Sequence, residues 1–170
     1  MIIKSFELNK INFQENMFYL FYGENDGHKN EVVKINFTKN NSQSLYRYDE
    51  DQILNNKDEF FNSILSKSFF ENNKIIIISR ASDKIKPIVN EIINKQIKDI
   101  KLLLISNILD KKSKLRSFFE KEKNTICVAF YADTIQTLNS LALKFFKEKK
   151  IPIIITVHNY RLLLDRIKFF

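Results

Sequence analysis

The sequence has very little glycine and proline and no tryptophan. Two Gly and two Pro among 170 residues leave no stretch typical of a flexible linker, and the Asn- and Lys-rich segments do not form low-complexity repeats. The longest apolar runs are far too short to cross a bilayer, and charged residues interrupt the apolar N-terminus too early for a signal peptide. We therefore expect a globular, cytoplasmic protein with no membrane partner.

Cysteine is almost absent as well. The single cysteine, Cys127, cannot form an intramolecular disulfide, and its apolar neighbours in TICVAFY are typical of a small core residue. His28 and His158 are far apart, and no Cys or His stands at ligand spacing from Cys127. The sequence predicts no metal site and no cofactor.

Apolar and basic residues are abundant. Hydrophobic residues make up 44% of the chain and include 16 Phe, enough for one medium-sized domain with a buried core. The net charge is +8, with 28 Lys and Arg against 20 Asp and Glu. Such a surplus favours contact with a polyanion such as DNA or with an acidic protein surface, although it also serves solubility.

Five short β-type runs alternate with helical patterns. The runs occupy residues 17–22, 44–48, 74–79, 100–106 and 125–131. Two of them, KIIIIS and KLLLIS, are continuously apolar, as expected of central strands covered by helices on both faces. The order predicts an α/β fold with a parallel five-stranded sheet flanked by helices.

Helical apolar spacing marks four further segments. These are residues 58–70, 83–97, 112–123 and 134–150. Pro87 suits a first helical turn, and Ser113 and Thr134 are candidate N-caps. The last twenty residues begin with an extended run and end with a short helical pattern.

The segment FYGENDGHKNE has nearly the spacing of a phosphate-binding loop. That loop requires G-x-x-x-x-G-K-[ST], in which the second Gly admits the phosphates and the hydroxyl binds Mg²⁺. Gly23 and Lys29 stand at matching positions, but His28 replaces the second Gly and Asn30 replaces the hydroxyl. We interpret the motif as degenerate and favour Gly23 as a strand-to-helix turn and Lys29 as a solvated lysine of the first helical turn over residual phosphate binding.

A P-loop ATPase also needs a metal-binding carboxylate at the end of a neighbouring strand, and this chain has none at the expected position. KIIIIS ends in Ser79 and Arg80, and Asp83 comes later, where we expect the next helix to start. No catalytic residue or active site is therefore expected.

Two charged segments have alternative interpretations. The acidic DED at 49–51 follows a strand, where catalytic carboxylates occur, but no nucleophile accompanies it and we favour a solvated loop. DKKSKLR at 110–116 could meet phosphate, yet its Asp and Ser also suit a helix start.

Phe69 and Phe70 are adjacent near the end of a helix that already has Phe60, Phe61, Ile64 and Leu65 for its buried face. Adjacent helical positions point about 100° apart, so both rings do not easily share one buried stripe. Either the helix ends there and both rings fold beneath it, or at least one ring is exposed for a partner.

Four segments in order resemble the N-terminal part of the delta subunit of the bacterial DNA polymerase III clamp loader. They are FYLFYGENDGHKNE, SFFENNKIIIISRASD, KLLLISNILDKKSKLRSFFEKEK and CVAFYADTIQTLNSLALKFFKEKKI. The resemblance covers about residues 15 to 152. It implies a P-loop NTPase fold of the AAA+ type without ATPase activity, in agreement with His28, Asn30 and Arg80.

The resemblance also implies a function in DNA replication. Members of this family bind and open the ring-shaped sliding clamp with a hydrophobic pair, which corresponds here to Phe69 and Phe70. The chain would then be a clamp-binding subunit of a DNA polymerase (nucleotidyltransferase) holoenzyme. A small P-loop ATPase and a basic DNA-binding protein are the alternatives.

The end of the chain departs from the family. IPIIITVHNYRLLLDRIKFF does not match the helical second domain, and no collar domain follows. We expect a degenerate AAA+-like domain at 1–133 and, at 134–170, a linking helix with a truncated or aberrant start of a small helical second domain. Contacts with other loader subunits are doubtful without the collar.

Overall fold

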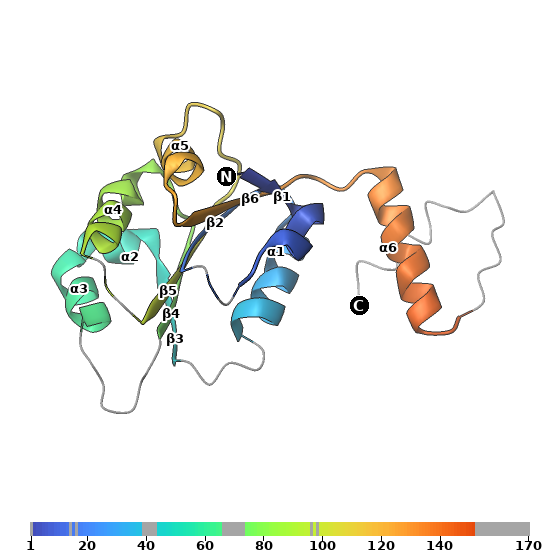
Figure 1. Ribbon diagram of the computed structural model, residues 1–170, viewed down its shortest axis with the longest axis horizontal. Coiled ribbons are helices and arrows are strands. Elements are labelled where there is room, and N and C mark those ends of the chain that lie inside the picture. Colours follow the sequence, from blue (N-terminus) through green and yellow to red (C-terminus); the bar gives the residue numbers. More distant parts are fainter. Residues whose placement is uncertain are drawn as a thin grey trace. The chain divides into compact units, whose positions relative to one another are not determined.

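The computed structural model describes residues 2–13, 15, 17–38, 44–65, 74–95, 97 and 99–151. Within these ranges the core is a six-stranded parallel sheet with the order β1-β6-β2-β5-β4-β3 (Figure 1). The strands are β1 (Ile2–Lys4), β2 (Phe18–Gly23), β3 (Ser44–Asp49), β4 (Lys74–Ser79), β5 (Ile100–Ile105) and β6 (Thr125–Phe130). The α/β fold and the parallel sheet are confirmed.

The predicted strand count was one too low. The additional strand, β1, pairs in parallel with β6 at the edge of the sheet, where Ile2 lies opposite Cys127. Three residues followed at once by the 3-10 helix η1 (Ser5–Lys10) are too few to give a strand pattern in the sequence. The two continuously apolar runs, β4 and β5, are interior strands as predicted.

Helices cover both faces of the sheet, and alternate residues of β2 divide between them. Leu20 faces a cluster that contains residues of α2 (Glu50–Asn55), α3 (Lys57–Leu65), α4 (Lys86–Asn94) and α5 (Lys114–Lys121). Phe21 faces a second cluster with residues of α1 (Asp26–Val33) and the π-helix η2 (Lys34–Thr38). Figure 1 shows the same division, with α2 to α5 on one side of the sheet and α1 on the other.

The predicted helix starts are largely correct. Pro87 lies in the first turn of α4, which follows the 3-10 helix η3 (Asp83–Ile85). The Ser113 and Thr134 side chains accept hydrogen bonds from Arg116 N–H and Thr137 N–H, so both are N-caps. In α3, the expected buried face is formed by Phe60, Phe61 and Ile64, whereas Leu65 is 46% exposed, against expectation.

The chain divides into two compact units, Met1–Tyr131 and Ala132–Phe170. The first contains the sheet and its covering helices. In the second, the structure describes α6 (Ile135–Glu148) and the residues around it as far as Ile151. No helix among the described residues is long and apolar enough to span a membrane.

Cys127 lies in the middle of β6, fully buried as predicted for a core residue. Burial raises the pKa of its thiol to about 12, because the thiolate would be poorly solvated among apolar side chains.

We predict that the Cys127 thiol is unreactive in the native protein. The thiolate is the reactive form, so a maleimide or aromatic disulfide reagent at pH 8 should label the folded chain far more slowly than the guanidinium-unfolded chain. Rapid labelling of the folded protein would show that β6 opens readily or that the thiol is accessible.

Candidate functional site at the carboxyl edge of the sheet

The turn after β2 lies at the carboxyl edge of the sheet, between the ends of two neighbouring strands. β2 pairs with β5 on one side and with β6 on the other. The Gly23 N–H donates to Asn107 O at 3.0 Å, and the Asn25 N–H donates to Phe130 O at 3.3 Å. In open parallel α/β sheets, ligands bind beyond the carboxyl ends of the strands, which makes this turn the place to look for a site.

Gly23 is the strand-to-helix turn that the sequence predicts. Its φ is +124°, a conformation that side-chain-bearing residues rarely adopt. A Cβ at this position would lie 2.0 Å from Phe130 O. Glycine is therefore required by backbone packing against β6, whether or not a phosphate ever binds.

Lys29 contradicts the prediction of a solvated lysine. The side chain is 1% exposed, and its ammonium donates to Gly23 O and Ser106 O, both at 2.8 Å. It also forms an ion pair with Asp26 at 2.8 Å. An ammonium has three N–H donors, so these three contacts can use all of them.

The position of Lys29 determines what the turn can do. In a functional phosphate loop, the lysine at this position neutralises the phosphates of the nucleotide. Here the same charge is directed at the backbone carbonyls at the ends of β2 and β5. We conclude that the ammonium holds the carboxyl edge together instead of presenting a free cation.

The two substituted motif positions face different surroundings. The His28 ring meets the Phe130 ring edge-on, with 5.2 Å between centroids. The backbone N–H of His28 donates to the side-chain oxygen of the N-cap Asn25. Asn30 is exposed on α1. Neither residue is placed as a metal ligand, and no three carboxylate, His or Cys side chains among the described residues gather as a metal site.

The ends of β3 and β4 are joined by charged contacts. Arg80 has a positive φ of 57° and pairs with Asp49 at 2.6 Å, and this hydrogen bond lowers the pKa of the Asp49 carboxyl. Glu50 is buried, and its carboxylate accepts hydrogen bonds from Ser82 N–H at 2.7 Å and from Ser82 Oγ. The acidic segment 49–51 thus forms the start of α2, and Glu50 connects it by hydrogen bonds to Ser82, the N-cap of η3. It is not the solvated loop that we expected.

Asp83 starts η3, as the sequence predicts, and its carboxylate also caps a second helix. It accepts hydrogen bonds from Ser113 Oγ at 2.6 Å, Leu115 N–H at 2.9 Å and Lys114 N–H at 3.0 Å. Burial raises the pKa of Asp83, but these three hydrogen bonds outweigh it and hold the pKa below its ordinary value. The helix-start interpretation of segment 110–116 is correct, because α5 begins there.

The sequence did not single out two structurally important residues, Ser82 and Ser106, and it marked Glu50 only as part of the acidic segment 49–51. The Ser106 Oγ donates to Ala81 O at 2.5 Å. The backbone carbonyl of Ser106 accepts a hydrogen bond from the Lys29 ammonium. Glu50 and Ser82 stand 32 positions apart. No local pattern indicates such a pair, because the contact exists only once β3 and β4 are paired.

Phe69 and Phe70, the proposed contact residues, lie outside the residues that the structure describes. The described part of α3 ends at Leu65, just before them.

Comparison with known proteins supports the fold. No protein-family model matches the chain, and no curated protein matches it. The solved structure of the Bacillus subtilis DNA clamp loader delta protein (YqeN) is similar, with a TM-score of 0.59 and 13% sequence identity. The alignment covers 85% of this chain and 48% of the clamp loader protein, so the chain spans about half the length of that neighbour. At this identity the likeness shows a clamp-loader-like fold and nothing finer.

We predict that Lys29→Met destabilises the protein. Methionine keeps the aliphatic stem but leaves Gly23 O and Ser106 O without their donor, which should lower the free energy of unfolding by about 3 kcal/mol. The matched control is Lys34→Met, because Lys34 is exposed at the end of the same helix and the change should cost less than about 0.5 kcal/mol. Urea unfolding of both variants measures the difference, and equal stabilities would show that the buried ammonium does not hold the edge.

Proposed function

We propose that the chain is a delta-like clamp-loader protein, which binds and opens a sliding clamp in DNA replication through protein contacts and without ATPase activity of its own. The observation that carries this proposal is the likeness of its fold to the clamp loader delta protein. The contacts of Lys29 support the proposed absence of ATPase activity, because its ammonium is bound to protein carbonyls. The rival small P-loop ATPase would need that lysine for the nucleotide.

The proposed clamp contact is the pair Phe69 and Phe70. The described end of α3 supports this placement, because Phe60, Phe61 and Ile64 fill its buried face and Leu65 is already 46% exposed. In the described part of α3, this face is thus filled before the helix reaches Leu65. Aromatic anchors of this kind often dominate the energy of a protein interface.

In this proposal the chain has no active site of its own, and its proposed direct partner is the sliding clamp. Other loader subunits would supply ATP hydrolysis. Because the chain spans about half of the neighbour's length, contacts with those subunits are a separate question from clamp binding.

We predict that Phe69→Ala and Phe70→Ala each weaken clamp binding by on the order of 2–4 kcal/mol while the melting temperature changes little. Burial in the core would produce the opposite pattern, with about 3–5 kcal/mol of lost stability and a loss of binding that merely follows unfolding. Thermal melts and titrations against the sliding clamp of the same organism distinguish the two. The matched control is Phe6→Ala, since Phe6 is a 72% exposed ring in η1, directly after the edge strand β1.

A second candidate function, DNA binding, is favoured by a cluster of basic side chains at the carboxyl edge. Asp83 joins η3 to the start of α5, and this brings two lysine-bearing segments together. The lysines are Lys84, Lys86, Lys111, Lys112 and Lys114. Such a cluster offers a duplex several phosphate contacts without reading its sequence.

For this candidate we predict that replacing Lys111, Lys112 and Lys114 by Ala weakens duplex binding and makes its salt dependence shallower, by roughly one unit of slope for each phosphate that the variant no longer neutralises. Replacing the exposed Lys144, Lys147 and Lys149 provides a control with the same reduction in charge. Equal slopes in the two triple variants would mean that charge alone, and not this cluster, attracts DNA.

A further inference from the structure

The last described turn of α3 is bonded to the first residue of the interior strand β4. That residue, Lys74, is only 7% exposed, and its ammonium donates a hydrogen bond to Ser63 O at 3.0 Å. Ser63 lies two residues before Leu65, where the described part of α3 ends. Hydrogen bonds from a charged donor are stronger than those between neutral groups, so this contact connects the end of α3 firmly to the sheet.

Lys74 is itself held in a defined place. Its backbone N–H donates to Asp99 O at 2.8 Å, and β4 lies between β3 and β5 in the sheet. The ammonium also lies 5.5 Å from the centroid of the Tyr46 ring of β3, within the range of a cation–π contact. Because the lysine is buried and its surroundings belong to the sheet, the sheet determines where Ser63 O lies.

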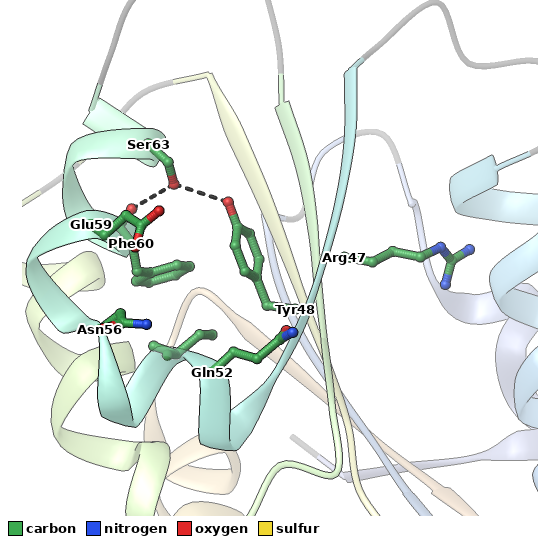
Figure 2. Close-up of a pocket in the computed structure, with 8 residues that line it drawn as sticks. Arg47, Tyr48, Gln52, Asn56, Glu59, Phe60 and Ser63 are labelled. Carbon is green, nitrogen blue, oxygen red and sulfur yellow. Dashed lines mark hydrogen bonds between the residues drawn. The ribbon is translucent and has the colours of Figure 1, made fainter.

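A second contact reaches Ser63 from the edge strand β3. The Ser63 hydroxyl donates its hydrogen to Phe60 O at 2.7 Å, so Tyr48 is the donor in its 3.0 Å contact with Ser63 (Figure 2). The Tyr48 ring also meets the Phe60 ring edge-on, with 5.1 Å between centroids. Ser63 thus accepts a hydrogen bond from β3 at its hydroxyl and another from β4 at its carbonyl.

An open groove makes these polar contacts important for the position of α3. The groove has a volume of about 340 Å³, lies between β3 and the helix pair α2–α3, and is lined in part by Gln52, Asn56 and Glu59 (Figure 2). Close packing therefore does not join α3 to β3 along the whole helix. Across the groove, α3 reaches β3 through the ring and the hydroxyl of Tyr48.

We propose that Lys74 is a positioning residue for the clamp contact, which acts by fixing the end of α3 through Ser63. The inference rests on the proposed function, in which Phe69 and Phe70 bind the sliding clamp. Both stand between Ser63 and Lys74 in the sequence, so one hydrogen bond joins the two ends of the segment that contains them. An anchor that is already in place before binding reduces the conformational entropy that binding costs, so removal of this bond lowers the affinity.

The test compares Lys74→Met and Lys74→Arg with the unmodified chain in titrations against the sliding clamp of the same organism. Methionine keeps the aliphatic stem but removes the donor, so Lys74→Met should weaken clamp binding about tenfold. Arginine keeps a cationic donor and should bind within about threefold of the unmodified chain. All titrations are made well below the melting temperature of each variant, where unfolding does not lower the apparent affinity.

The matched control is Lys57→Met, because Lys57 forms an ion pair with Glu91 at 2.9 Å at the opposite end of α3. This pair is exposed, and its loss should change clamp affinity less than about twofold. An equal loss of affinity in Lys57→Met and Lys74→Met would show that any loosening of α3 has this effect, and would overturn the specific role of Lys74.

Tyr48→Phe is a milder second variant, which decides the matter if Lys74→Met does not fold. It keeps the ring and removes only the hydroxyl that donates to Ser63, so it should weaken clamp binding about threefold. In both variants, the amides of the last described turn of α3 should exchange hydrogen faster than in the unmodified chain, whereas those of α4 should not.

The outcomes separate this inference from the proposed function. Clamp binding of unchanged strength by folded Lys74→Met, or by Tyr48→Phe where Lys74→Met does not fold, would overturn the positioning role and leave the proposed function intact. Unchanged hydrogen exchange in α3 would overturn it as well. If the unmodified chain does not bind the clamp, the proposed function fails, and the role of Lys74 in clamp binding fails with it.

Discussion

The buried ammonium of Lys29 is the contact on which the carboxyl edge of the sheet depends. It joins the first turn of α1 to the carbonyls of Gly23 and Ser106, at the ends of two adjacent strands. Hydrogen bonds from a charged donor are stronger than those between neutral groups, and two buried carbonyls would lose their donor if this one were removed. The same geometry explains the conformation of Gly23, because its carbonyl can reach Lys29 while its Cα packs against Phe130 of β6.

Further hydrogen bonds connect other loops along the carboxyl edge of the sheet. The carboxylate of Glu50 holds the backbone and side chain of Ser82, and the carboxylate of Asp83 caps α5. In an ATPase of this fold, strand-end carboxylates and a hydroxyl near these positions would serve Mg²⁺ and phosphate. Here the polar groups connect the loops at the ends of the strands to one another.

The sequence predicted those parts of the molecule that local patterns encode. β4 and β5 are continuously apolar, and their interior positions followed from that pattern; Ser113 and Thr134 were identifiable as N-caps because a cap acts on residues within its own turn. β1 and α2 were missed because three and six residues are too short to show a period. The burial of Lys29 was mispredicted for another reason: Ser106 stands 77 positions further along the chain, so only the pairing of β2 with β5 brings its carbonyl to the ammonium.

The central claim is that this edge is closed by the protein's own groups and that the chain acts by contact instead of nucleotide chemistry. Isothermal titration of the intact chain with ATP, with and without Mg²⁺, tests this claim most directly. The account predicts no saturable, Mg²⁺-dependent binding up to millimolar ATP, because the lysine at the loop is already engaged. Tight Mg²⁺-dependent binding would contradict it and would mean that Lys29 leaves the carbonyls of Gly23 and Ser106 to reach a phosphate.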